Sequence, residues 1–255
     1  MSSRVDARCE LATSHQPEHP RSSLRTAAQR ARIHAKAMSS MLSVPLRNPA
    51  WGNAGYRGNC DGTLIKNLIL RYDGVRSIAD PMEGSGTTRD VVAWLNGQLG
   101  LGLTYWGGDL RSGFNLLKRS LPGKYDLVWL HPPYWDIIRY SDHAADLSTS
   151  ADYTLFLTRL RRCLARCAEA VAPGGRLAVL VGDVRRNGRY YCLARDVMNM
   201  AGDLGELSAV IIKAQHNVRS NSKHYSGMVE PRIQHETCVV FRKPLTRERW
   251  RPAGG

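Results

Sequence analysis

The feature that most constrains this chain is a short apolar run followed by an acidic, glycine-rich turn and a helix-like segment. The run is Val75–Ala79, the turn is Asp80-Pro-Met-Glu-Gly-Ser-Gly-Thr-Thr88, and the helix is expected from Thr87 to Leu95. Strands that alternate with helices in this way build an open, mostly parallel α/β sheet. Ligands of such sheets bind beyond the carboxyl ends of the strands. The segment therefore predicts both a fold class and the place of a ligand site.

The same alternation continues along the chain. We expect one α/β domain, with helices on both faces of a mostly parallel sheet and an antiparallel pair of strands at its C-terminal end. Residues 1–50 are expected to be a basic, partly disordered segment with a helix at 23–42, residues 51–245 the α/β domain, and residues 246–255 a tail. The remaining strands are expected at Leu101–Trp106, Tyr125–Leu130, Arg176–Gly182, Leu207–Ala214 and His235–Phe241, and the remaining helices at 62–72, Tyr153–Ala172 and Tyr190–Ala201.

Composition limits the class of protein and of partner. The chain has 255 residues, 43% of them apolar, which suffices for one sizeable α/β domain with appendages. Its net charge of +14 favours a polyanionic partner, with a merely solvated basic surface as the alternative. The sequence has no apolar run long enough to predict a membrane span, and no secretory signal is expected. We therefore expect a protein of the bacterial cytoplasm or nucleoid. The six cysteines lack metal-ligand spacing, so we expect no structural metal.

A second informative segment follows the apolar run Tyr125–Leu130. It reads His131-Pro-Pro-Tyr134, a rigid turn with one polar and one aromatic side chain, which suits the holding of an exocyclic amino group. Together the two turns resemble motifs I and IV of the amino-methyltransferases that use S-adenosylmethionine to methylate adenine N6 or cytosine N4 in DNA. The resemblance covers roughly residues 55–243 and implies a single Rossmann-like class I methyltransferase domain.

The resemblance also implies a cofactor site. The glycine-rich turn looks like the "DPFxGSGTT" form of motif I, with Met82 in place of the usual Phe. Asp109, after the second strand, resembles the motif II acid that accepts hydrogen bonds from the ribose hydroxyls, although a turn residue or helix cap is the alternative. Gly58-Asn-Cys-Asp61 resembles motif X. The implied cofactor residues are Asn59, Cys60, Asp61, Asp80, Met82, Gly84, Ser85, Gly86, Thr87, Thr88 and Asp109.

Motif IV implies the chemistry of methyl transfer. An aromatic amine has its lone pair delocalised into the ring, and two hydrogen-bond acceptors on its protons free that pair for attack. In the family these acceptors are the first side chain of the motif and the first proline carbonyl, here His131 and Pro132. Pro133 fixes the turn and Tyr134 would stack on the flipped base. His131 replaces the usual Asp, Asn or Ser, and only a neutral imidazole can accept.

Target recognition is expected after motif IV, because only roughly forty residues separate the cofactor turn from His131. Two basic segments qualify, near 183–191 and 215–234, with ordinary solvated loops as the alternative. Their Arg, Lys, Asn and His side chains suit phosphate and base-edge contacts. The residues expected to bind DNA are Arg185, Arg186, Arg189, His216, Arg219, Asn221, Lys223, His224, Tyr225 and Arg232.

The sequence therefore predicts a DNA adenine-N6 methyltransferase that binds S-adenosylmethionine and duplex DNA and flips its target base. Cytosine-N4 methylation is the close alternative. The more distant alternatives are an RNA or protein-glutamine methyltransferase and a DNA-binding protein without enzyme activity. Recognition loops this small favour a homodimer that reads a palindromic site. The recognised sequence and any partner nuclease are not indicated by the sequence.

Overall fold

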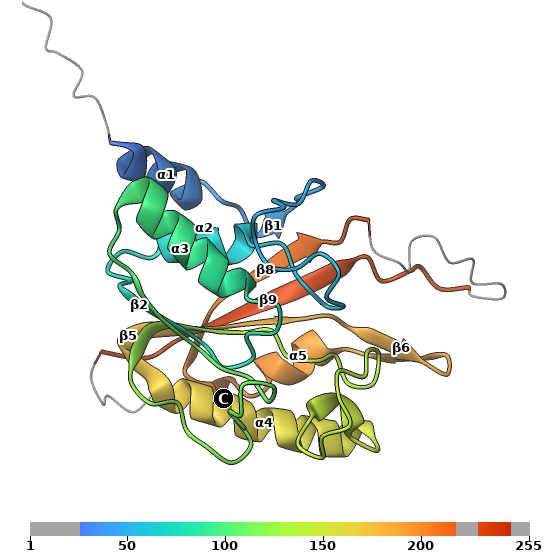
Figure 1. Cartoon of the computed structure of the whole chain (residues 1–255). Helices are drawn as coiled ribbons and strands as arrows, with labels where there is room; N and C mark the ends of the chain where they lie inside the picture. Colours follow the sequence, from blue (N-terminus) through green and yellow to red (C-terminus); the bar gives the residue numbers. More distant parts are fainter. Residues whose placement is uncertain (1–25, 218–228, 246–255) are drawn as a thin grey trace, which may run out of the picture.

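A twisted seven-stranded sheet forms the centre of the molecule, and helices cover both of its faces (Figure 1). The computed structural model describes residues 26–217 and 229–245. The strands of the main sheet are β1 (Met41–Leu42), β2 (Ser77–Asp80), β3 (Thr104–Gly107), β4 (Tyr125–Leu130), β5 (Val171–Val181), β8 (Glu206–Ala214) and β9 (His235–Arg242). The helices are α1 (Ala27–Lys36), α2 (Thr63–Arg71), α3 (Thr87–Leu99), the 3₁₀ helix η1 (Leu147–Thr149), α4 (Tyr153–Ala170), α5 (Leu193–Met198) and α6 (Ala201–Leu204).

The strand order is β1-β8-β9-β5-β4-β2-β3. β9 runs antiparallel to its neighbours β5 and β8, whereas every other described pair in this sheet is parallel. This arrangement confirms the predicted Rossmann-like, mostly parallel sheet with an antiparallel C-terminal pair. β1 adds a further strand beyond β8, so residues 41–42 belong to the sheet rather than to a separate N-terminal segment.

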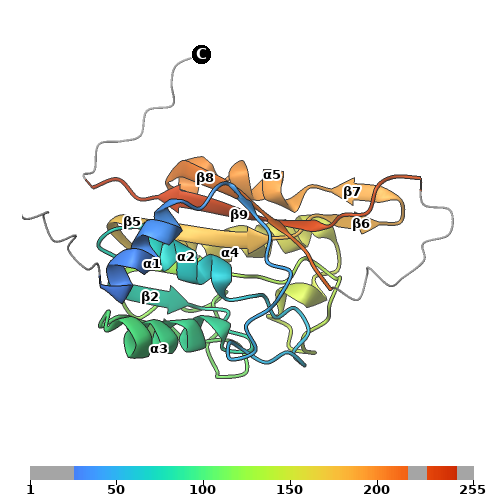
Figure 2. The same cartoon turned by 90° about the horizontal axis from the view of Figure 1, so that it is seen from above.

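Alternate residues of the inner strands fill two separate cores. In β4, Val128 and Leu130 pack with α4 and α5, while Leu127 and Trp129 pack with α2 and α3 on the opposite face. All four side chains are 2% exposed or less. Figures 1 and 2 show the two helical layers on either side of the sheet. A strand buried on both faces needs a continuous apolar run, which is why 125–130 could be predicted to the residue.

Several element ends differ from the sequence-based expectation. α4 ends at Ala170 and not at Ala172, because Val171 already pairs with Tyr125 and begins β5 ahead of the Pro-Gly-Gly sequence. α3 continues past Asn96 to Gly100, which caps it with a φ of 60°. α1 begins after Thr26, whose side chain and Gln29 form a capping box, and it ends at Lys36 instead of 42.

Residues 183–191 form a hairpin where the sequence predicts a loop. β6 (Val184–Arg186) and β7 (Arg189–Tyr191) pair in antiparallel register. The hairpin projects beyond the carboxyl end of β5 (Figure 2). The predicted helix at Tyr190–Ala201 is correspondingly shorter and is split into α5 and α6. None of the helices in the described ranges is long and apolar enough to cross a membrane.

Candidate active site

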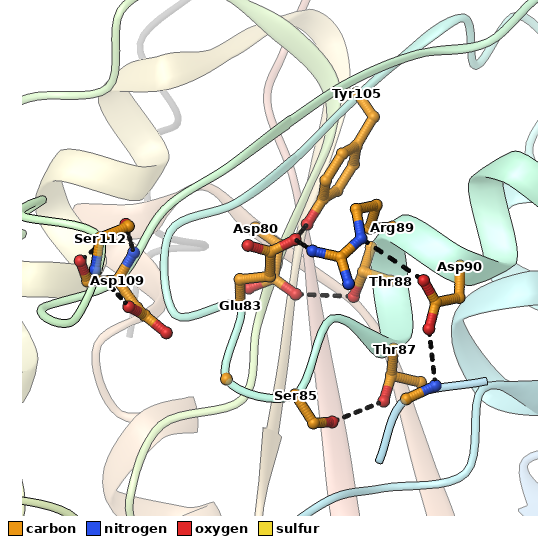
Figure 3. Close-up of polar contacts among 12 residues, drawn as sticks. Asp80, Glu83, Ser85, Thr87, Thr88, Arg89, Asp90, Tyr105, Asp109 and Ser112 are labelled. Carbon is orange, nitrogen blue, oxygen red and sulfur yellow. Dashed lines mark hydrogen bonds and ion pairs between the residues drawn. The ribbon is translucent and has the colours of Figure 1, made fainter.

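Asp80 is the buried centre of the glycine-rich turn. It ends β2, is 3% exposed, and accepts hydrogen bonds from the Thr88 hydroxyl (2.6 Å) and the Met82 amide (3.1 Å). Figure 3 shows Thr88, at the start of α3, reaching back to the carboxylate. Burial raises the pKa of Asp80 to about 7, even though both hydrogen bonds favour the ionised form. The carboxyl group therefore titrates near neutral pH.

Two glycines of this turn adopt backbone conformations that other residues avoid. Gly84 has a φ of 56° and Gly86 a φ of 84°. A Cβ atom on Gly84 would lie 3.3 Å from the Tyr56 ring. Glycine at 84 therefore both permits the turn and keeps the space between it and Tyr56 open. Gly86 is the N-cap residue of α3.

Asp109 lies in the turn after β3, beside the first turn. Its Oδ1 atom accepts from the backbone amides of Arg111 (2.8 Å) and Ser112 (3.0 Å), so part of this carboxylate shapes its own turn. Its Oδ2 atom lies 3.2 Å from the Arg111 guanidinium, which also donates to the Gly84 carbonyl. The Glu83 amide adds a hydrogen bond to the Gly108 carbonyl. The two turns are therefore joined by the backbone and by Arg111.

The segment before α2 closes the same space from another side. The side-chain oxygen of Asn59 accepts a hydrogen bond from the Thr87 hydroxyl at 2.6 Å, which ties this segment to the glycine-rich turn. Cys60 is a neutral thiol, because burial raises its pKa to about 12. Asp61 accepts from the Thr63 amide at the start of α2 (2.7 Å) and does not line the cavity. Asn59 and Cys60 thus line the cavity, whereas Asp61 binds the first turn of α2.

The His131 turn follows β4, the neighbour of β2 in the sheet. The imidazole Nε2 atom lies 2.7 Å from the Tyr134 hydroxyl, and that hydroxyl donates to Glu236 at 2.7 Å. Burial lowers the pKa of His131 below its ordinary value of 6.5, with opposing influences from Glu236 and Lys213. The imidazole is therefore neutral at physiological pH and has one nitrogen able to accept a hydrogen bond.

Residues around the His131 turn fix its direction. Trp135 has a φ of 53°, which is unusual for a bulky residue and reverses the chain after Tyr134. The Trp135 indole is buried, donates to the Ser150 carbonyl (3.3 Å), and packs against Tyr153 and Tyr191. Gly182 makes room for the Tyr134 ring, since a Cβ there would lie 2.6 Å from it. One side of the Tyr134 ring is therefore occupied by the end of β5.

A single cavity connects the glycine-rich turn with the His131 turn. Most of the predicted cofactor residues line it, and so do His131 and Pro133. Asp61, Gly86, Pro132 and Tyr134 are not among its lining residues. The predicted residues that line the cavity are Asn59, Cys60, Asp80, Met82, Gly84, Ser85, Thr87, Thr88, Asp109, His131 and Pro133.

Other lining residues were not predicted from the sequence. Tyr56 and Tyr140 stack with ring centroids 6.0 Å apart, and Arg111 lies 4.9 Å over the Tyr56 ring. Phe114 forms an apolar wall of the cavity, and Trp106 packs edge-on behind it with ring centroids 4.9 Å apart. Loop tyrosines give no periodic signal, so sequence pattern could not single them out. Among the described residues no cluster of His, Cys, Asp and Glu side chains could hold a metal ion.

The basic segments expected to bind DNA are only partly described. Arg185 and Arg189 lie on the hairpin over the rings of Tyr190 (5.4 Å) and Tyr191 (5.2 Å). Arg186 forms an ion pair with Asp136 (2.7 Å), which lies just after the His131 turn. His216 hydrogen-bonds Ser43 at 2.9 Å, and Arg232 is exposed. The predicted residues Arg219, Asn221, Lys223, His224 and Tyr225 lie outside the described residues.

Among the comparisons with known proteins, only the comparison with solved structures gives matches. No protein-family model matches the chain, and no curated protein matches it. A candidate DNA modification methylase of Thermus thermophilus is 22% identical, with 67% of this chain and 53% of that protein covered and a TM-score of 0.36. The same protein complexed with S-adenosyl-L-methionine gives 27% identity, 51% and 49% coverage, and a TM-score of 0.35.

Two further solved structures are similar at the same level. The N-methyltransferase NodS of Bradyrhizobium japonicum WM9, in complex with S-adenosyl-L-homocysteine, is 12% identical, with 72% and 85% coverage and a TM-score of 0.41. A candidate class I S-adenosylmethionine-dependent methyltransferase of Listeria monocytogenes is 15% identical, with 76% and 62% coverage and a TM-score of 0.44. The present chain spans about half the length of the Thermus protein. With every TM-score below 0.5, the strand order of this chain remains the evidence for its fold.

Proposed function

We propose that this protein is a DNA methyltransferase that transfers a methyl group from S-adenosylmethionine to the N6 amino group of an adenine turned out of the duplex. One observation carries the proposal: the glycine-rich turn and the His131 side chain line the same cavity, from the carboxyl ends of the neighbouring strands β2 and β4. The residues proposed for the cofactor and the residue proposed to accept from an amine thus line one cavity.

The residues around the first turn fit S-adenosylmethionine. Gly84 keeps the backbone open, and Met82, Phe114 and Leu116 supply apolar walls suited to the adenine ring. The Asp109 carboxylate at the cavity would accept from ribose hydroxyls. Asp80 is a buried carboxyl group that gains from a nearby cation, because its pKa is raised to about 7 by burial. When bound, the cofactor supplies an electrophilic methyl group on a positively charged sulfur.

The His131 turn supports the second half of the reaction. A neutral imidazole nitrogen of His131 would accept one proton of the target amino group as a hydrogen bond. The family pattern gives the other proton to the Pro132 carbonyl, although Pro132 does not line the cavity in this structure. Such contacts would draw the amine lone pair out of the aromatic ring and toward the methyl carbon. The C–N bond would form as the C–S bond breaks, S-adenosylhomocysteine would leave, and the cationic amine would then lose one proton to water. Catalysis here is positioning and electrostatics rather than proton abstraction in the first step.

The DNA surface in this proposal is the hairpin of β6 and β7 together with the chain between β8 and β9. The hairpin follows β5 and the second segment follows β8, and both strands run in the same direction as β2 and β4, so their carboxyl ends lie at the same edge of the sheet (Figure 1). Arg185 and Arg189 stand on the hairpin, and the ion pair between Arg186 and Asp136 connects it to the residues after the His131 turn. The net charge of +14 favours the same polyanionic partner.

Transfer of tritiated methyl groups tests the proposal. The protein is incubated with labelled S-adenosylmethionine and, in separate reactions, duplex DNA, RNA or a mixture of proteins. Label in DNA is expected from the wild type and from His34→Ala, whose imidazole is exposed on α1, but not from His131→Ala. Label in RNA or protein alone would identify those molecules as the substrates instead of DNA, and label in none of the three would contradict the proposed activity.

A further inference from the structure

Four polar side chains form a continuous chain of contacts behind the cavity. His131 Nε2 lies 2.7 Å from the Tyr134 hydroxyl, which lies 2.7 Å from Glu236 Oε1. The other oxygen of Glu236 is 2.7 Å from the Lys213 ammonium. Lys213 and Glu236 are direct partners in the β8–β9 ladder, so the sheet register holds the charged end of the chain in place.

The ion pair is costly in this position. Lys213 is 8% exposed and Glu236 is 7% exposed. Removing two charges from water carries a desolvation penalty that their attraction seldom exceeds by much, and apolar side chains of similar size are often as stable. The strand interior next to Glu236 is otherwise occupied by residues such as Cys238 and Val239. Sheet stability alone therefore does not account for the pair.

The chain of contacts determines which atom carries each proton. Burial by itself would raise the pKa of Glu236, but attraction to Lys213 holds it below its usual value, so this carboxylate only accepts. Burial and Glu236 together raise the pKa of Tyr134 well above 10, so its hydroxyl keeps its single proton. That proton is donated to Glu236. The Tyr134 oxygen can then only accept from His131.

A neutral imidazole has one N–H group, and in this arrangement it must be the one at Nε2. The reverse arrangement would direct the Tyr134 proton at His131 and leave two oxygen atoms without a proton between them at 2.7 Å. Nδ1 consequently carries the lone pair. Among residues 26–217 and 229–245, no hydrogen bond to His131 Nδ1 is present, and His131 lines the cavity.

We propose that Lys213, Glu236 and Tyr134 are positioning residues that hold His131 as its Nε2–H tautomer and so present Nδ1 to the amino group of the target base. The assignment of Nδ1 to a base rests on the function proposed above, whereas the tautomer is a property of the protein alone. Tyr134, which does not line the cavity, thereby acts through its hydroxyl. Tyr134→Phe, which keeps the ring and removes the hydroxyl, is therefore expected to lose activity.

Nuclear magnetic resonance of the full chain labelled with ¹⁵N-histidine measures the tautomer directly. Long-range proton–nitrogen spectra at pH 8 separate a protonated from an unprotonated ring nitrogen, and the His131 signals are those missing from His131→Gln. The wild type is expected to show a protonated Nε2 and an unprotonated Nδ1. A protonated Nδ1 in the wild type would overturn the proposal.

Two variants then test what holds the tautomer. Lys213→Met with Glu236→Leu removes the ion pair without leaving a single buried charge. The Tyr134 hydroxyl should then donate to Nε2 and move the imidazole proton to Nδ1. Tyr134→Phe should give a mixture of tautomers and at least about tenfold slower methyl transfer. Tyr125→Phe, at the far end of β4, is the matched control and should change neither.

The outcomes separate the two proposals. If the variants keep the wild-type tautomer, the positioning chain is wrong even where the wild type methylates DNA. If the tautomer switches as expected while the wild type transfers no methyl group, the chain stands and the proposed function fails. Near-native far-ultraviolet circular dichroism of each variant shows that the fold is retained in the comparison.

Discussion

The glycine-rich turn and the His131 turn leave neighbouring strands at the same edge of the sheet, yet they are held in different ways. Asp80 is bound by Met82 and Thr88, which lie within eight residues of it. The His131 turn is bound through Tyr134 to Glu236, 102 residues further along the chain. The buried carboxylate of the first turn is held by local contacts, whereas the side chains of the second are held through the completed sheet.

This difference separates two tasks within one cavity. The Asp80 carboxylate is in place as soon as β2 and α3 have formed. A turn that depends on β8 and β9 has its acceptor atom in place only when the antiparallel pair is inserted beside β5. We therefore expect substitutions at the first turn to change cofactor affinity, and substitutions at the second to change the rate of transfer.

The largest expected effect is at the second turn. His131→Ala should lower kcat by about 100-fold to 1000-fold, comparable to removal of a preorganised hydrogen-bonding group in other enzymes. Cofactor affinity should remain within about twofold, because a tenfold change would need about 1.4 kcal/mol and no contact of that size is lost. His131→Asn should retain measurable activity, since an amide oxygen can also accept. Steady-state kinetics with calorimetry measures both quantities, and unchanged kcat in His131→Ala would remove His131 from the reaction.

The next effect concerns the first turn. Asp109→Ala should weaken S-adenosylmethionine binding by about 1–3 kcal/mol, through loss of the ribose acceptor. Because Asp109 also shapes its own turn through Oδ1, Asp109→Asn serves as a control that keeps this acceptor and loses the charge. Its affinity should lie between those of the wild type and Asp109→Ala. Equal affinity of all three proteins in calorimetry would place the ribose elsewhere.

A smaller effect should appear in the pH dependence of cofactor binding. The pKa of Asp80 is raised to about 7 by burial, so the carboxyl group becomes ionised as pH increases through neutrality. The ionised form attracts the positively charged cofactor, and affinity should rise by up to about tenfold between pH 6 and pH 8. Calorimetry with Asp80→Asn should give a flat profile. A wild-type profile as flat as that of the variant would disprove a titrating Asp80.

The smallest effect is expected on the DNA surface, outside both turns. Arg185→Ala with Arg189→Ala should reduce the slope of log affinity against log salt by about 0.9 for each lost phosphate contact. Arg161→Ala with Arg162→Ala, exposed on α4, is the matched pair and should leave the slope unaltered. Replacement of Arg219, Lys223 and Arg232 tests the second basic segment in the same way. Identical slopes for the hairpin variant and the α4 variant would exclude the hairpin as a phosphate contact.

Sequence could predict the parts of the fold that depend on local pattern. The apolar run 125–130 matched β4 at both ends, and the acidic, glycine-rich turn led to Asp80, Gly84 and Thr88 in one cavity. The hairpin of β6 and β7 was also predictable in principle. Asn187 and Gly188, with φ values of 49° and 76°, form the two-residue turn that Asn-Gly sequences favour.

Other features depended on distant contacts. Glu236 and Lys213 lie near the ends of strands that carry other charged residues, Arg242 and Glu206, at their opposite ends, and a strand end is usually exposed. Only the order β8-β9-β5-β4 brings Glu236 to Tyr134, and strand order is not encoded in any local pattern. The end of α4 at Ala170 likewise depends on pairing between β4 and β5. The sequence could therefore single out His131, which lines the cavity, as the proposed acceptor, but not the groups that contact it through Tyr134.

Nucleoside analysis of DNA is the most direct measurement of whether the two turns act together. DNA from cells that express the wild-type protein, His131→Ala or His34→Ala is digested to nucleosides and analysed by mass spectrometry. N6-methyladenine is expected with the wild type and His34→Ala and should fall to the background of untransformed cells with His131→Ala. N4-methylcytosine instead of N6-methyladenine would identify cytosine as the target base. Equal amounts of methylated base with and without His131 would contradict the proposed function of this cavity.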